Sequence, residues 1–236
     1  MKAKLRVDVP HAFVAKGADL GKIWQLFAAD GMKLSATVRC KDDIVREFTS
    51  LDELLAYENP VRAAMLSIEI SARSSDWESS AEVTLGGKYR SPMSLSLGGE
   101  EALITKWQSS LADTLDGMRS WYSRIATLDL FYVAMPLFVV LMFSLQVSDA
   151  PAAPKSAVTF QRTLYLTVLA LGLMALVYFI GSAISRLRAR FFPVATFAVG
   201  QGIARHAFGE QIRWVVIIGF VISVLASLFV TPILAI

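Results

Sequence analysis

Two uncharged apolar runs in the second half of the chain constrain its fold more than any other feature. Residues 164–184, LYLTVLALGLMALVYFIGSAI, and residues 214–236, WVVIIGFVISVLASLFVTPILAI, contain no lysine, arginine, aspartate or glutamate. A helix needs about 20 apolar residues to cross a hydrocarbon layer about 30 Å thick. A chain of 236 residues is too small to cover two helices that are apolar on every side. Both runs therefore predict transmembrane helices.

A third run, residues 125–145, has the same length but contains Asp129 and Pro136. A charge near a helix end costs less than the roughly 2.5–3.5 kcal/mol that it costs at the bilayer centre. An intramembrane proline is tolerated as a kink. We therefore expect an all-α membrane domain over residues 125–236 with three transmembrane helices.

Asp129 is the only acid within a predicted span, and an intramembrane charge is a candidate functional group. One interpretation is a structural ion pair near the interface with Arg186 or Arg190. The other is a role in conduction or proton relay. The ion pair is favoured because these arginines are predicted to lie at a similar depth on the neighbouring span.

Charge differs between the two halves of the chain. Before residue 125 there are 16 lysines and arginines and 17 acids, whereas afterwards there are 7 and 3. The predicted loop 185–213 holds five of those seven cations, Arg186, Arg188, Arg190, Arg205 and Arg213, which would also meet lipid headgroups. The basic balance thus belongs to the membrane half and does not indicate nucleic-acid binding.

The arginines of this loop also predict the orientation of the chain. Lysine and arginine accumulate in short cytoplasmic loops. We expect a multi-pass protein of the plasma membrane, or of the inner membrane if the source is bacterial, with a cytoplasmic N-terminus and the C-terminus outside. Trp121, Tyr122 and Trp214 would then lie at the cytoplasmic interface, where amphipathic rings are enriched.

Small residues recur every four positions on the third span, at Gly219, Ser223 and Ser227. This spacing lets helix backbones approach closely in lipid. The face predicts close helix packing, either within one chain or between copies, and we expect a homo-oligomer.

The segment FFPVATFAVGQG, residues 191–202, is apolar although it lies outside the predicted spans. It is interpreted equally well in two ways. A helix lying in the membrane interface would bury Phe191, Phe192 and Phe197 at the headgroup boundary. Alternatively, the segment is a loop packed under the soluble domain.

Residues 1–124 predict a cytosolic α+β domain with a mainly antiparallel sheet and short helices. Period-2 patterns indicate strands in residues 33–40 and 65–74, with Leu66, Ile68 and Ile70 on one face of the second, and a hairpin joins residues 81–85 to 93–97. Residues 18–31 and 50–60 read as helices, the second opening on the capping-box pair Ser50 and Glu53.

Residues 100–124 predict the last helix of this domain. Its apolar stripe comprises Leu103, Trp107, Leu111, Leu115, Met118 and Tyr122. Because only Gly117 interrupts its helix-forming residues, we expect one long helix that runs without a break into the first span.

The sequence holds no recognisable constellation for catalysis or metal binding. His11 and His206 fall in different halves, and Cys40 is the only cysteine. His206 is interpreted as a headgroup or capping residue, and Cys40 as buried packing. We therefore expect no catalytic residue, no metal ligand and no cofactor.

Two functional classes fit these features. The first is a non-enzymatic sensing or adaptor protein whose cytosolic domain binds a protein partner and whose spans localise it in the lipid bilayer. The alternative is an oligomeric pore-forming or membrane-disrupting effector triggered through the same domain. The uncharged spans favour the first, because a water-filled pore needs polar lining.

Overall fold

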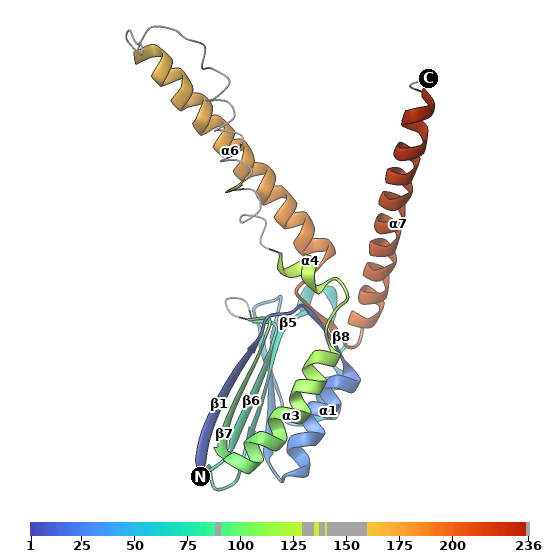
Figure 1. Cartoon of the computed structure of the whole chain (residues 1–236). Helices are drawn as coiled ribbons and strands as arrows, with labels where there is room; N and C mark the ends of the chain where they lie inside the picture. The colour runs from blue at the N-terminus through green and yellow to red at the C-terminus, as the bar shows by residue number, and fades with distance from the viewer. Residues whose placement is uncertain (88–90, 129–134, 137–139, 141–159, 235–236) are drawn as a thin grey trace. The chain divides into compact units, whose positions relative to one another are not determined.

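The computed structural model describes residues 1–87, 91–128, 135–136, 140 and 160–234 (Figure 1). The chain divides into two compact units. The first combines Met1–Thr127 with Pro193–Ile236, and the second is Leu128–Phe192. The C-terminal helix therefore belongs to the same unit as the N-terminal domain.

A six-stranded antiparallel sheet forms the centre of the first unit. Its strands lie in the order β1-β7-β6-β5-β3-β4. Their bounds are Lys2–Val9 for β1, Met93–Glu100 for β7, Ser80–Leu85 for β6, Met65–Arg73 for β5, Lys33–Cys40 for β3 and Val45–Phe48 for β4. The predicted α+β class with an antiparallel sheet is confirmed, including the hairpin of β6 and β7.

Two helices, α1 (Gly17–Ala29) and α3 (Glu101–Gly117), lie side by side against one face of this sheet (Figure 1). Trp107 of α3 meets Phe27 of α1 edge to face, with ring centroids 5.4 Å apart. The short helix α2 (Leu51–Ala56) precedes a 3-10 turn, Val61–Ala63. Ser50 caps α2 as predicted, since its Oγ accepts from the backbone N–H of Glu53 at 3.3 Å.

The strand alternation is right in β3, where Ala36, Val38 and Cys40 are buried, but it fails at one residue of β5. Leu66 is 48% exposed, although Ile68 and Ile70 are buried as predicted. The pairing of β3 with β5 shifts between Arg39 and Cys40, so that Cys40 faces Met65. Met65 is therefore buried in place of Leu66.

The predicted long helix is interrupted, so the expectation of a continuous helix over residues 100–124 is wrong. α3 ends at Gly117, and the next helix, α4, covers only Ser123–Thr127. The N–H groups of Met118 and Arg119 still bond back to α3, but Met118 O and Ser120 N–H bond to residues 12–14. Val14 N–H donates to Met118 O at 2.9 Å, and Ser120 N–H donates to Ala12 O at 3.0 Å.

Two long apolar helices follow in the C-terminal part, α6 (Phe160–Phe191) and α7 (Gly202–Leu234). Within the described residues, Leu171–Phe191 and Gly202–Val224 are long and apolar enough to cross a membrane. They contain much of the predicted spans 164–184 and 214–236. The remaining predicted span, 125–145, lies largely outside the described residues.

The predicted loop 185–213 is mostly helical, which corrects the expected boundaries. α6 continues to Phe191 because no breaker precedes Pro193, and α7 already begins at Gly202. Between them, β8 (Ala195–Ala198) pairs in parallel with β2 (Phe13–Lys16).

Phe197 on β8 decides between the two interpretations of the apolar segment. Its side chain is 5% exposed and meets Phe13 edge to face, with ring centroids 5.8 Å apart. The interpretation as an interfacial helix is therefore wrong for Phe197, because strand pairing holds it in the core of the domain. Phe191 and Phe192 are half-buried.

Candidate functional site

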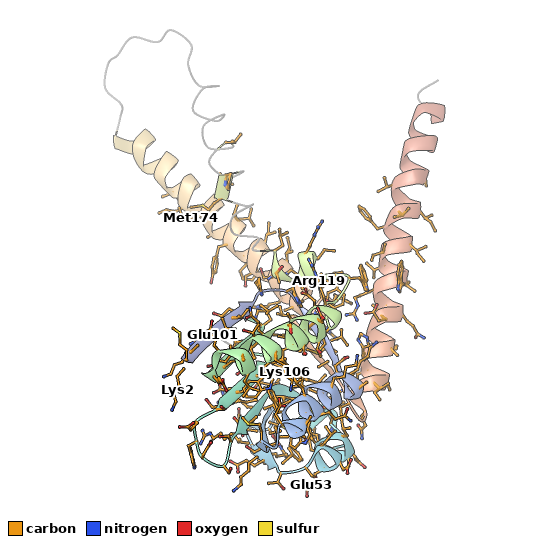
Figure 2. The ribbon with its side chains drawn as sticks, turned by 60° about the horizontal axis from the view of Figure 1, so that its bottom comes forward. Lys2, Glu53, Glu101, Lys106, Arg119 and Met174 are labelled. Carbon is orange, nitrogen blue, oxygen red and sulfur yellow. The ribbon has the colours of Figure 1, made fainter. Side chains whose placement is uncertain are left out.

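The segment between α3 and α4 leads the chain out of the N-terminal domain, and residues 12–14 fix its position. Besides the bonds of Met118 and Ser120, the backbone N–H of Ala12 donates to Ser123 Oγ at 2.9 Å. Phe13 also forms an isolated antiparallel bridge with Arg119, which is labelled in Figure 2. Trp121 and Tyr122 therefore occupy a defined position at the exit from the domain.

Five side chains at this exit form what we call the junction cluster: Trp121, Tyr122, Glu210, Arg213 and Trp214. Trp121 stacks on Trp214 of α7 with ring centroids 5.6 Å apart and 25° between the planes. Trp121 also meets Tyr122 edge to face, at 5.5 Å. The cluster thus joins residues that precede the first predicted span to residues at the start of the third.

Glu210 holds the polar side of the junction cluster together. Its Oε2 accepts from Trp121 Nε1 at 3.0 Å, and its Oε1 accepts from Arg213 at 2.9 Å. The Arg213 side chain is 4% exposed, and its guanidinium lies 4.5 Å from the centroid of the Tyr122 ring. A buried cation needs such partners, and Glu210 and the Tyr122 ring supply them here.

Asn59 connects the domain to the beginning of α7 at a second point. It is 1% exposed and adopts a positive φ of 50°. Its Nδ2 donates to Phe197 O and Val199 O, both at 3.2 Å, and its Oδ1 accepts from Met65 N–H at 2.9 Å. Arg205 of α7 in turn donates to Asn59 O at 2.7 Å.

The structure brings four of the predicted site residues into one cluster, namely Trp121, Tyr122, Trp214 and Arg213. Their predicted places at the membrane interface stay predictions, but Arg213 contacts protein groups. Sequence reasoning missed Glu210 and Asn59 as contact residues. Glu210 could have been noticed as the only acid of the arginine-rich segment.

The other predicted residues lie outside the cluster. Arg186, Arg188 and Arg190 lie in the last turns of α6, where cations complement the helix dipole. Asp129 lies outside the described residues, so its pairing stays a prediction.

The small face of α7 makes no close contact at Gly219 within the described chain. No atom there lies within 4 Å of the place that a Cβ on Gly219 would take. Ser223 Oγ donates to Gly219 O at 2.8 Å, so its hydroxyl is satisfied within the helix. The side chain of Ser227 is outside the described part, and the packing role of this face stays a prediction.

In the part of the chain that the structure describes, the residues that could hold a metal or act as nucleophiles do not lie together. Within the described ranges, no three His, Cys, Asp or Glu side chains form a metal-binding group. Cys40 is buried, with its Sγ 3.7 Å from the Tyr57 hydroxyl, which donates to Ala63 O at 2.7 Å. Burial raises the pKa of Tyr57, so this hydroxyl stays a donor at neutral pH.

Comparison with models of known protein families, with curated proteins and with solved structures gives no match for this chain.

Proposed function

We propose that the chain is a membrane-anchored sensing or adaptor protein without enzymatic activity. Its N-terminal domain would lie in the cytoplasm and bind a protein partner, and its apolar helices would hold it in the bilayer. The proposal extends to three spans, a C-terminus outside the cell and assembly into a homo-oligomer.

The single observation that carries this proposal is the junction cluster. Trp121 and Tyr122 lie where the chain leaves the domain, Glu210, Arg213 and Trp214 lie in the first half of α7, and contacts link all five. A packed cluster of aromatic rings around a buried cation resists independent movement of its members. A change in the domain at residues 118–122 would therefore reach α7 directly.

Hydrogen exchange on the full chain in lipid nanodiscs tests this coupling. Trp121→Ala removes both the ring stack and the hydrogen bond to Glu210, so it should raise amide exchange in residues 118–127 and also in residues 202–214. Trp121→Phe keeps a ring against Trp214 and should cause a smaller rise. Unchanged exchange in residues 202–214 with Trp121→Ala would show that domain and helix are not coupled here.

A pore is the competing function, and a membrane-potential dye separates the two. Cells that express the full chain should keep their potential, and a photocrosslinker at exposed positions of the domain should trap one dominant protein partner. A depolarisation that Asp129→Leu abolishes would overturn the adaptor function in favour of the pore. Failure to trap any partner from several domain positions would also count against an adaptor.

A further inference from the structure

The face of the sheet opposite α1 and α3 is polar. Its row at Lys33 and Arg73 is basic, and the next row on the same face contains Glu82 opposite Ser71. Leu34 pairs with Ala72 on the apolar face, so their neighbours Lys33 and Arg73 lie directly opposite each other on the outer face. The same row continues through Ser80 and Gly98 to Lys4. It therefore contains three cations and no acid.

This placement of Lys33 and Arg73 is unfavourable by itself, because like charges directly opposite on neighbouring strands repel. Within the described residues, no carboxylate lies within 4.0 Å of either cation. The acids of the adjacent turn have other partners. Asp76 Oδ1 accepts from Ser74 Oγ and from the backbone N–H of Glu78, and Glu78 pairs with Lys2 at 3.0 Å.

A cavity of about 380 Å³ lies beside these two cations. We call it the basic pocket and define it by Lys33, Ser35, Ser71, Arg73, Ser74 and Trp77. Lys33 and Arg73 offer two positive charges, Ser35 and Ser71 offer two hydroxyl groups, and Trp77 offers an indole ring, whereas the Ser74 hydroxyl already donates to Asp76. Hydroxyls and cations together are the donors that bind phosphate oxygens.

Trp77 has an unusual conformation at the rim of the basic pocket. It is 75% exposed and has a positive φ of 63°, a region that bulky residues rarely adopt. The turn holds it there, since its N–H donates to Ser74 O at 3.1 Å. The Arg73 guanidinium lies 5.2 Å from the ring centroid, on one face of the indole. The other face of the exposed indole can therefore stack against a second flat group.

We propose that the basic pocket binds a small phosphorylated ligand with a flat ring, of the nucleoside monophosphate class. The phosphate lies between Lys33 and Arg73 and relieves their repulsion, while the base stacks on the exposed face of Trp77. The cavity is within the range of small-ligand sites, about 300–1,000 Å³. That such binding would serve as the sensing event rests on the proposed function, but the binding itself does not.

Binding is tested by calorimetry on the full chain in nanodiscs of uncharged phosphatidylcholine. The probes are AMP, GMP, UMP and CMP, with ribose 5-phosphate lacking the base and adenosine lacking the phosphate. At least one monophosphate should bind about tenfold or more tightly than both truncated probes. Base stacking and charge-assisted hydrogen bonds each contribute about a factor of ten or more to the affinity.

Variants locate the site. Lys33→Gln and Arg73→Gln should each weaken nucleotide binding about tenfold, the effect of losing one charge-assisted contact. Trp77→Asn keeps a residue that tolerates positive φ, so it should lower nucleotide affinity to that of ribose 5-phosphate and leave the latter unchanged. The matched control is Lys22→Gln, on the exposed side of α1, which should bind as the wild type does.

Three results would overturn the inference. These are no binding of any monophosphate at millimolar concentration, equal binding of ribose 5-phosphate and the nucleotides, or wild-type affinity in both cation variants. An O-phosphoserine peptide that bound more tightly than every nucleotide would assign the pocket to a phosphorylated protein instead. None of these outcomes bears on the membrane-potential and crosslinking experiments, so the two proposals fail separately.

Discussion

At the scale of single residues, the Asn59 side chain links segments that are distant in sequence, which its position in the sequence does not indicate. One side chain satisfies two carbonyls of the link into α7 and one N–H of β5, all in a buried place. Asparagine also tolerates the positive φ found here. The sequence indicates only that a helix ends before Pro60, because nothing local reveals partners about 140 residues away.

Removing the Asn59 side chain should therefore destabilise the first unit. Asn59→Gly keeps the backbone conformation and leaves buried polar groups unpaired, so we expect a loss of about 2–4 kcal/mol in the free energy of unfolding. Asn59→Ala should lose about 1 kcal/mol more, because alanine is strained at positive φ. Urea unfolding of the full chain in detergent measures both. A loss below about 0.5 kcal/mol in either variant, typical of a surface substitution, would contradict this role of Asn59.

Asp30 is a second residue whose partners are distant in sequence, because both of them lie on α3. Its Oδ1 accepts from Lys106 Nζ at 2.6 Å and its Oδ2 from Trp107 Nε1 at 2.7 Å, which ties the end of α1 to α3 (Figure 2 labels Lys106). The hydrogen bonds from Lys106 and Trp107 lower the pKa of Asp30. A lowered carboxyl pKa stabilises the fold above the unfolded-state pKa of about 3.9 and ceases to do so as the pH falls through the folded value.

Asp30→Asn should accordingly be less stable than the wild type by a constant amount between pH 7 and about pH 5. The difference should shrink below about pH 4, as the carboxyl of the wild type becomes protonated. Lys106→Gln keeps the bond from Trp107 and should give a smaller difference with the same pH dependence. Urea unfolding at a series of pH values measures the difference in the free energy of unfolding between wild type and each variant. A difference for Asp30→Asn that persists undiminished to pH 2 would contradict a stabilising role of the Asp30 carboxylate.

At the scale of elements, those with a clear local periodicity could be predicted, whereas features that depend on pairing with a distant strand could not. Strand 33–40 and helix 18–31 follow from periodicity, and the structure places β3 and α1 there. Leu66 was misplaced because the shift opposite Cys40 depends on the partner strand. β8 could not be predicted because it forms by pairing with β2, which precedes it by about 180 residues.

The end of α3 departs most from the sequence prediction, which expected the helix to continue past residue 117. Gly117 is the apparent breaker, yet its φ is not in the left-handed region and a Cβ there would meet nothing within 4 Å. Where the helix ends, Met118 O and Ser120 N–H bond to residues 12–14. Gly117→Ala should therefore raise the free energy of unfolding by about 0.5–1 kcal/mol, since glycine loses more entropy on folding.

Urea unfolding and hydrogen exchange together check this substitution. Protection should persist at the amides of Val14 and Ser120, because the helix does not extend past residue 117 when alanine stands there. A destabilised Gly117→Ala variant, or loss of protection at these two amides, would show that glycine itself ends the helix.

At the scale of the whole molecule, hydropathy predicts that apolar helices exist, whereas contacts decide where they begin. The sequence placed the start of the third span at Trp214, but α7 begins twelve residues earlier and packs against the domain through Arg205, Glu210 and Arg213. Charged residues at these positions made the segment look like a loop. Their partners, Asn59 and Trp121, are distant in sequence, so the candidate site could be predicted only in part.

The number of spans sets the topology of the whole chain, and fusions to alkaline phosphatase and to a fluorescent protein in bacterial cells can measure it. With a cytoplasmic N-terminus, three spans place Lys155 outside, Arg190 inside and Ile236 outside. If α6 and α7 alone crossed, each of these locations would be reversed. We expect phosphatase activity for fusions after Lys155 and Ile236, and fluorescence for a fusion after Arg190. The reversed pattern, with phosphatase active only after Arg190, would overturn this topology. It would mean that residues 125–145 do not cross or that the N-terminus lies outside, and in either case the arginines of α6 would lie on the outer side, against the charge rule on which the orientation rests.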